Sequence, residues 1–214
     1  MTRIVLMANA KPGVEIIKYL KSDKTSEIVA IYLSNTYKDF DEEIVKISNL
    51  SADRLFSSTL LNDKKHQAWL ENEEVDFIIT VYWPYLLDEK VFSLARETIN
   101  FHPALLPVNR GWYPHVHSII DGTPAGISLH SITKDADKGP IWAQKEVPIL
   151  LTDDSKSLYL RLQNEIIKLF KLNWPLIREA KIKPYLQLEE GASYHKKNEI
   201  SLLDEIKLND NYTG

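Results

Sequence analysis

The chain has 214 residues, of which 44% are apolar and 26% are charged, and its formal net charge is −4. This length and composition suit one globular domain of ordinary to large size. The acidic balance, with no basic block beyond the pair Lys196-Lys197, argues against nucleic-acid binding, which needs a basic face. With no cysteine, the sequence excludes disulfides, cysteine–zinc sites and thiol nucleophiles.

The sequence begins MTRIVLMANA, a short apolar run that Lys11 and Pro12 follow at once. It lacks the basic leader and the cleavage site of a signal peptide, so we interpret it as a first strand. No apolar run approaches the ~20 residues that cross a bilayer. We therefore expect a cytoplasmic protein without membrane contact.

Short β-branched runs alternate with helical patterns through the first half of the chain. The predicted strands cover 3–8, 27–33, 75–83 and 98–102, and the predicted helices cover 14–22, 41–49, 63–73 and 88–96. This alternation predicts a doubly wound, Rossmann-like α/β fold with a mostly parallel sheet. Ligands of such sheets bind beyond the carboxyl ends of strands, where the segments YWPY (82–85) and NFH (100–102) lie.

The second half begins with two strand-like runs, 126–132 and 139–149, joined by the polar loop TKDADK. A long amphipathic helix is predicted over 155–180, with Asp153 or Asp154 as its N-cap and a kink or break at Pro175. The residues after it are polar. The domain hypothesis is a main domain over residues 1–180 and a small C-terminal extension over 181–214 that packs on it.

The residues with chemical potential lie between 99 and 140. The stretch INFHPALLP places Asn100 and His102 two apart at the end of a predicted strand. Such a pair is usually structural when it stands alone. Here it is followed by a Gly-led turn at Gly111, by His130 on a strand, and by a loop that carries Asp137.

This pattern resembles the family of formyltransferases that use formyltetrahydrofolate, which includes the glycinamide ribonucleotide, methionyl-tRNA and sugar-nucleotide enzymes. The family motif is Asn-x-His-Pro-x-Leu-Leu-Pro, then a Gly-led turn, a His-bearing strand and an Asp loop. The matching residues are Asn100, His102, Pro103, Leu105, Leu106, Pro107, Gly111, His130, Asp137 and Gly139. A looser match extends from about residue 1 to 150, so the main domain over 1–180 is expected to be the catalytic domain.

Formyl transfer to an amine passes through a tetrahedral oxyanion, which well-placed donors stabilise by a few kcal/mol. We predict that the His102 imidazole and the Asn100 amide are these donors. The attacking amine must also lose a proton. Asp137 is the candidate base, and its carboxylate would hold His102 protonated. Asp135 is the alternative, and Asp137 is preferred because it stands two residues before Gly139, as in the family.

The resemblance implies that the formyl donor, formyltetrahydrofolate, lies against the segment VYWPYLL (81–87), with the loop 132–139 closing from the other side. The residues predicted to contact it are Pro84, Tyr85, Leu86, Leu87, His130, Asp135 and Gly139. The aromatic turn can alternatively be core packing. No metal is expected, because His115 and His117 would point about 200° apart on the helix that we expect after Pro114.

We infer the identity of the acceptor amine by comparing this sequence with the different enzymes of the family. The turn ANAKPGVE lacks the Gly-rich phosphate loop of glycinamide ribonucleotide enzymes. Methionyl-tRNA enzymes usually carry a further basic domain, whereas this chain is acidic and has the length of a catalytic core. The stretch NRGWYP (109–114) and the later SYHKKNEISLLDEI instead resemble sugar-nucleotide N-formyltransferases.

The predicted substrate is therefore a nucleotide-linked amino-dideoxy sugar of the dTDP-4-amino-4,6-dideoxyglucose type, used for surface polysaccharides such as O-antigen. The residues predicted to bind this substrate are Arg110, Gly111, Trp112 and Tyr113. Arg110 can fork onto a pyrophosphate, and Trp112 and Tyr113 can stack on a base or sugar. Both rings can instead be structural. The alternatives are a formyltetrahydrofolate hydrolase, a glycinamide ribonucleotide formyltransferase, and a folate- or nucleotide-binding module without turnover. A homodimer is expected by family analogy.

Overall fold

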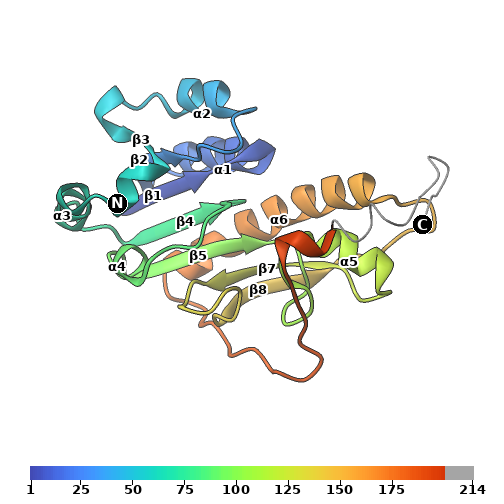
Figure 1. The fold of residues 1–214 in the computed structure, drawn as a ribbon. Helices are drawn as coiled ribbons and strands as arrows, with labels where there is room; N and C mark the ends of the chain where they lie inside the picture. Colours follow the sequence, from blue (N-terminus) through green and yellow to red (C-terminus); the bar gives the residue numbers. More distant parts are fainter. Residues whose placement is uncertain (201–214) are drawn as a thin grey trace. The chain divides into compact units, whose positions relative to one another are not determined.

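The structure is a computed structural model that describes residues 1–200 (Figure 1). The chain forms two compact units. The first comprises residues 1–101 and 131–134, and the second comprises residues 102–130 and the described residues from 135 onward. The chain passes from one unit to the other within β5, before the last residue of β7 and after residue 134.

The first unit is built on parallel strands in the order β3-β2-β1-β4-β5. These strands are β1 (Thr2–Ala8), β2 (Ser26–Leu33), β3 (Leu55–Ser57), β4 (Phe77–Val81) and β5 (Glu97–His102). The chain moves outward from β1 to β3 and then returns to β4 on the other side of β1. This reversal is the topological switch point of a doubly wound sheet.

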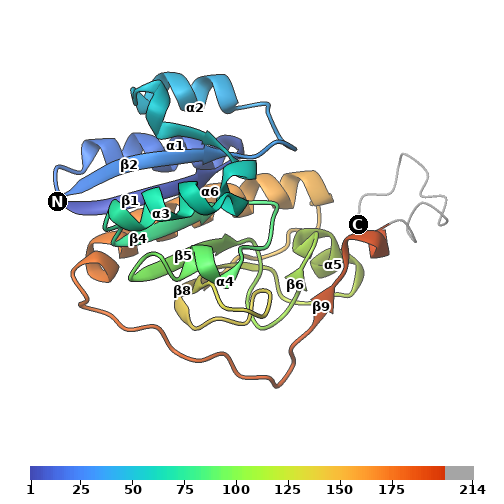
Figure 2. The same ribbon diagram turned by 60° about the vertical axis from the view of Figure 1, so that its left-hand side comes forward.

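Helices cover both faces of this sheet (Figure 2). They are α1 (Ala10–Ser22), α2 (Asp41–Ser48), α3 (Lys64–Asn72) and α4 (Glu89–Phe92), with 3-10 turns at Ala52–Arg54 and Ser58–Asn62. Val5 and Met7 of β1 share a buried cluster with Leu70 of α3. The alternate residues Ile4 and Leu6 are equally buried and point to the opposite face. Because β1 and β4 are covered on both sides, their sequences are continuous apolar runs.

The second unit holds an antiparallel hairpin and two helices. The hairpin strands are β7 (Gly126–Ser131) and β8 (Ile141–Glu146), and the helices are α5 (Pro114–Ile120) and α6 (Ser155–Arg178). Two short strands, β6 (Arg110–Gly111) and β9 (Tyr194–His195), pair in parallel (Figure 2). A 3-10 turn at Lys197–Ile200 follows β9.

Helix α6 begins at Ser155, as the sequence predicts, and extends beyond Pro175. Asp154 is the N-cap and forms a capping box with Ser157, while Asp153 pairs with Arg161. The helix continues through Pro175 to Arg178, so the break that was predicted as the alternative to a kink does not occur, and a kink at Pro175 stays a prediction. The buried face repeats at helical spacing and comprises Leu158, Leu162, Ile166, Phe170, Trp174 and Ile177.

After α6 the chain runs back along the second unit as a segment that we call the C-terminal strap, residues 185–195. Tyr185 exchanges two backbone hydrogen bonds with Ile141, of 2.8 and 2.9 Å. Ser193 and His195 accept from the backbone N–H groups of Arg110 and Trp112. The hypothesis of a domain over 1–180 and an extension over 181–214 stays a prediction, and its residues 201–214 lie outside the described residues.

Most predicted elements are confirmed with shifts at their ends. Helix α1 begins at Ala10, before Pro12 rather than after it, because proline is tolerated in the first turn of a helix. Helix α4 is shorter than the predicted 88–96, and β3, β6 and β9 were not predicted. Among the described helices, none combines the length and apolar character that spanning a membrane requires.

Replacement of a core aromatic residue of α6 tests this packing. Trp174 is fully buried and stacks on Phe170 with ring centroids 5.3 Å apart. We expect Trp174→Ala to lower the free energy of unfolding by about 3–5 kcal/mol, measured by urea denaturation, because it leaves a large cavity. Leu172→Ala is the control on the same helix, since Leu172 is 74% exposed, and should change stability by less than about 0.5 kcal/mol. Equal losses in the two variants would contradict the placement of α6.

Candidate active site

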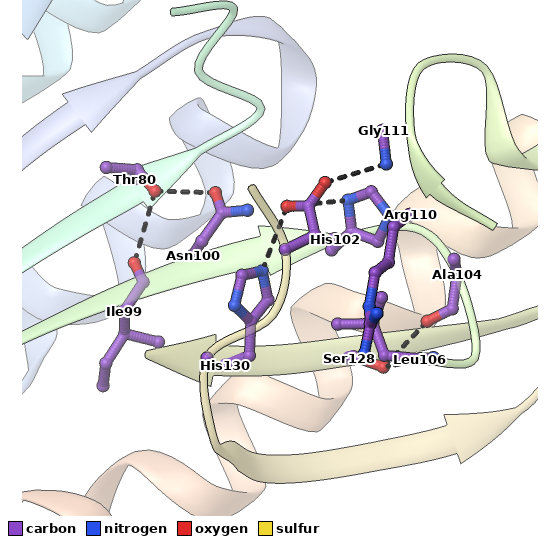
Figure 3. Close-up of polar contacts among 12 residues, drawn as sticks. Thr80, Ile99, Asn100, His102, Ala104, Leu106, Arg110, Gly111, Ser128 and His130 are labelled. Carbon is purple, nitrogen blue, oxygen red and sulfur yellow. Dashed lines mark hydrogen bonds and ion pairs between the residues drawn. The ribbon is translucent and has the colours of Figure 1, made fainter. Parts of the chain in front are cut away.

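The Asp137 carboxylate is where several predicted site residues meet. Its Oδ1 lies 3.6 Å from His102 Nδ1 and 3.4 Å from His130 Nε2. Its Oδ2 accepts a 2.9 Å hydrogen bond from the backbone N–H of Gly111. Figure 3 shows His102, His130 and Gly111 in this arrangement. Four segments that are separate in the sequence therefore supply one cluster.

Both imidazoles of this cluster are buried. His102 is 5% exposed at the end of β5, and His130 is 2% exposed on β7. The backbone of Asp137 has a φ of 54°, in the left-handed region that aspartate tolerates better than most residues. The loop thus directs the carboxylate toward the imidazoles at the expense of an unfavourable backbone conformation.

The electrostatics of the cluster favour an ionised Asp137. Burial alone would raise the pKa of its carboxyl, but the neighbouring imidazoles, His102 first, and the Gly111 N–H hold that pKa well below its ordinary range. Asp137 is therefore an anion at neutral pH.

The ring of His102 faces an oxygen atom at each nitrogen. Nε2 lies 3.1 Å from the backbone oxygen of Asn109, and Nδ1 faces Asp137. Only the imidazolium carries an N–H on both nitrogens, so the acceptors favour the charged ring. Burial acts in the opposite sense and lowers the pKa of His102, while the Asp137 carboxylate opposes this effect. The net result is a pKa of His102 below its ordinary value, and the Asp137 carboxylate is the group that limits this fall.

Asn100 belongs to the first unit, where the hydroxyl of Thr80 donates a 2.7 Å hydrogen bond to its Oδ1 (Figure 3). Thr80 itself lies on β4, which pairs with β5. The bond fixes the amide so that its oxygen points to Thr80 and its NH₂ group points away from it. The predicted convergence of Asn100 with His102 on one substrate stays a prediction.

Arg110 is held by the protein itself. It is 3% exposed, and its guanidinium donates to both carboxylate oxygens of Glu189 at 3.1 Å and to Gln187 Oε1 at 2.8 and 3.2 Å. The expected fork onto a pyrophosphate would require Arg110 to leave these partners. The structure therefore favours a bracing role for this residue.

The turn that follows Arg110 has an unusual backbone. Gly111 has a φ of 91° and Tyr113 a φ of 53°, and a bulky residue rarely adopts the latter. Trp112 and Tyr113 are half-buried, with ring centroids 5.9 Å apart. The ammonium group of Lys197 lies 4.7 Å from the Trp112 ring centroid. The aromatic pair is thus held in a defined place, as a stacking surface requires.

Asn109 is a site residue that the sequence reasoning missed. Besides presenting its backbone oxygen to His102, it donates through Nδ2 to Ser118 at 3.0 Å and Thr123 at 2.8 Å. Its Oδ1 lies 3.0 Å from His195 Nε2. An Asn before Arg-Gly indicates a turn, but its partners far along the chain leave no local signal.

The segment predicted to hold the folate lies in the first unit at the end of β4. Tyr82 has a φ of 53°, and its backbone oxygen accepts a 3.0 Å hydrogen bond from Asn9. Leu87 packs against the buried cluster of this unit, as core packing would require. Tyr85 and Leu86 are exposed, whereas Pro84 is half-buried. Pro84 separates the exposed Tyr85 from Trp83, which packs against the same buried cluster. The predicted contacts of Pro84, Tyr85, Leu86 and Leu87 with a folate stay predictions.

Within the loop, Asp135 and Asp137 differ in their surroundings. Asp135 is exposed, and its backbone oxygen accepts from the N–H of Lys138. Asp137 carries the imidazole contacts. Gly139 is buried, and its backbone oxygen accepts from Gln187. The geometry therefore favours Asp137 over Asp135 as the functional acid.

Two further features of the described residues include none of the residues of this cluster. His117, His195 and Glu199 have potential metal-ligand atoms within 4.8 Å of one another. However, the two imidazoles stack with centroids 3.5 Å and planes 10° apart, so their in-plane lone pairs do not converge. A pocket of about 260 Å³ at the ends of β2 and β3 contains no predicted site residue among its lining residues, which are Leu33, Ser34, Asn35, Lys38, Asp41, Leu55, Phe56 and Ser57. The absence of a metal role stays a prediction.

Comparison with known proteins identifies the class to which this fold and site belong. Residues 2–171 match the model of the formyl transferase family, so the chain belongs to that family, as the sequence motif predicted. The mostly parallel α/β fold expected from the sequence is also confirmed.

Among curated proteins, the dTDP-4-amino-4,6-dideoxyglucose formyltransferases of Mycobacterium tuberculosis and Mycobacterium bovis are 36% identical to this chain over 115 residues. The match covers 54% of this chain and 49% of each relative, so it spans about half the length of these relatives.

Among solved structures, a sugar N-formyltransferase from Shewanella sp. FDAARGOS_354 has a TM-score of 0.80 at 26% identity, covering 100% of this chain and 83% of that one. The formyltransferase PseJ from Anoxybacillus kamchatkensis, solved with UDP-4,6-dideoxy-4-formamido-L-AltNAc and tetrahydrofolate, has a TM-score of 0.69 at 28% identity. The match covers 100% of this chain and 94% of PseJ.

Substitution of Gly111 tests the packing of this turn. A Cβ atom there would lie 2.2 Å from the backbone oxygen of His195, so Gly111→Ala should separate β6 from β9. We expect a loss of at least about 2 kcal/mol in the free energy of unfolding. Gly122→Ala is the control, because Gly122 also has a positive φ but no atom within 4 Å of the added carbon, and it should cost only about 1 kcal/mol. If urea denaturation shows no difference between the variants, the β6–β9 contact is wrong.

Proposed function

We propose that this protein transfers a formyl group from formyltetrahydrofolate to the amine of a nucleotide-linked amino sugar. The observation that carries this proposal is the Asp137 cluster with His102, His130 and Gly111. These are residues that the sequence motif predicted, in a chain that matches the family model over most of its length.

The chemistry is a nucleophilic acyl transfer. The amine nitrogen attacks the formyl carbon, the carbonyl electron pair moves to oxygen, and a tetrahedral oxyanion forms. The nitrogen then loses a proton, the bond between the formyl carbon and the folate nitrogen breaks, and that nitrogen is protonated. The products are a formamide and tetrahydrofolate, so atoms and charge balance.

The described residues suit this sequence of steps. A charged His102 would donate to the oxyanion, and Asn100 would donate through the NH₂ group that points away from Thr80. Alternate residues of a strand project from one face, which supports a common role for Asn100 and His102. The lowered pKa of Asp137 makes it a weak base but a strong counter-ion. We therefore assign it to stabilising His102 and the positive charge on the attacking nitrogen, whose proton passes to the departing folate nitrogen.

The relatives support a sugar with its amine at position 4. The curated mycobacterial relatives are named for a dTDP-linked 4-amino-4,6-dideoxy sugar, and PseJ was solved with a UDP-linked 4-formamido sugar. They differ in the base and agree in the amine position. A dTDP-4-amino-4,6-dideoxyglucose type of substrate, made for a surface polysaccharide, is our proposal, together with a cytoplasmic homodimer.

A transfer assay tests the proposed function. The purified protein is incubated with formyltetrahydrofolate and, separately, with dTDP- and UDP-linked sugars that carry an amine at position 3 or 4. Mass spectrometry should show a gain of one formyl group on a 4-amino sugar. Release of formate without any formylated amine would instead establish the hydrolase alternative. If no formyltetrahydrofolate is consumed, the result would favour the alternative of a binding module without turnover.

Removal of either partner in the central ion pair should abolish most turnover. We expect His102→Ala and Asp137→Asn each to lower kcat by at least ~100-fold, because an oxyanion donor or its counter-ion is lost. Asp39→Asn, which removes an exposed carboxylate from the first unit, is the control and should leave kcat unchanged. Turnover within a few-fold of the parent protein in the first two variants would remove these residues from the mechanism.

The aromatic turn should act on substrate binding. We expect Trp112→Ala to raise KM for the sugar nucleotide by about 10-fold or more and to change kcat less, because one stacking face is lost. Trp112→Phe keeps a ring and should lie close to the parent protein. Steady-state kinetics at varied sugar nucleotide measures this difference. Equal effects of Trp112→Ala on kcat and on KM for the folate would show general misfolding rather than a binding role.

A further inference from the structure

The side chain of Gln187, in the C-terminal strap, contacts the loop that carries Asp137. We propose that Gln187 is a positioning residue that holds this loop in its functional conformation. The inference rests on the proposed function in so far as that function gives Asp137 its catalytic role. The structural part of the inference stands on contacts within the second unit alone.

The Gln187 amide uses both of its ends. Its Nε2 donates to the backbone oxygen of Asp137 at 2.8 Å and to that of Gly139 at 2.7 Å. Its Oε1 accepts from Nε and Nη2 of Arg110 at 3.2 and 2.8 Å. Two N–H donors and two oxygen lone pairs are the full capacity of this amide, so its orientation is determined.

The contacts close a ring around the catalytic carboxylate. Arg110 holds Gln187, and the next residue, Gly111, donates its N–H to the carboxylate of Asp137. Gln187 binds the backbone of that same residue, so side chain and backbone of Asp137 are fixed from two directions. Glu189 holds the far side of the buried guanidinium through two 3.1 Å contacts. Bonds to a charged donor are among the strong ones in proteins, which suits an anchor.

The loop needs such support because its conformation is unfavourable by itself. Asp137 has a φ of 54°, and a non-glycine residue in this region persists where the surroundings hold it. Beyond the loop, the backbone bonds of Tyr185 with Ile141 fasten the strap on the other side of Gly139. Without the two donors of Gln187, the Asp137 and Gly139 oxygens would turn to solvent and the carboxylate would move away from His102. Small displacements of catalytic groups cost large factors in rate.

Two substitutions separate the donors from the acceptor of this amide. Gln187→Leu removes both, whereas Gln187→Glu keeps an acceptor for Arg110 and loses the donors to the loop. If the carbonyl contacts matter, both variants should lower kcat by at least ~10-fold and change KM for the sugar nucleotide by less than ~3-fold. Gln67→Leu is the matched control, because Gln67 is a partly buried glutamine that donates to the backbone oxygen of Leu61 in the first unit. It should leave kcat unchanged.

A second readout does not depend on turnover. The Gly111 amide reports on the carboxylate, since its N–H is bonded to Asp137. Its hydrogen exchange, followed by NMR, should be at least ~10-fold faster in both Gln187 variants than in the parent protein and in the Gln67 control. Equal melting temperatures of the Gln187 and Gln67 variants exclude general unfolding, and Gln187→Glu carries the test if Gln187→Leu does not fold.

The outcomes distinguish this inference from the proposed function. Unchanged kcat and unchanged Gly111 exchange in the Gln187 variants of an active enzyme would overturn the inference and leave the function standing. A fully active Gln187→Glu would also overturn it, because the donors would then be dispensable. If the parent protein formylates no amine, the proposed function fails, and faster exchange in the variants would still show that Gln187 holds the loop.

Discussion

The arrangement of the second unit depends on a nearly buried carboxylate that three groups neutralise. Asp137 would be costly to place there without His102, His130 and the Gly111 N–H, because an unpaired charge loses its hydration. These partners come from different segments, so the requirement fixes the end of β5, the turn after it, β7 and the loop at once. It also suits the chemistry that we propose, since this anion opposes the effect of burial on the pKa of His102.

The C-terminal strap extends this constraint to residues far along the chain. Arg110 illustrates the consequence. A surface arginine beside an aromatic turn is a natural ligand for a pyrophosphate, but here Gln187 and Glu189 bind the guanidinium in the interior. The positive charge of Arg110 therefore supports the Asp137 loop indirectly, because Arg110 binds Gln187 and Gln187 binds the loop. Our proposal therefore gives recognition of the sugar nucleotide to groups such as Trp112 and Tyr113, and the strap binds the backbone N–H of Trp112 through the backbone oxygen of His195.

The sequence predicted what local patterns encode. The runs RIVLMA and FIITV belong to β1 and β4 because strands buried on both faces must be apolar throughout. The strands β6 and β9 have two residues each and no periodicity, so nothing local could indicate them. The family motif predicted His102, His130 and Asp137 as site residues. Gln187 lies 48 to 77 positions from its partners, and Asn109 lies 86 positions from His195. The polar strap resembles a loose extension in its composition.

The central claim is that Asn100, His102 and Asp137 serve one reacting carbon, and a crystal structure of a ternary complex tests it most directly. The complex would contain a non-transferring formylated folate and a nucleotide-linked 4-amino sugar. The account predicts the formyl carbon and the sugar nitrogen within about 3–3.5 Å of each other, with the formyl oxygen at hydrogen-bonding distance from Asn100 and His102 and the amine facing Asp137. Ligands bound in a place that none of these three side chains reaches would contradict it.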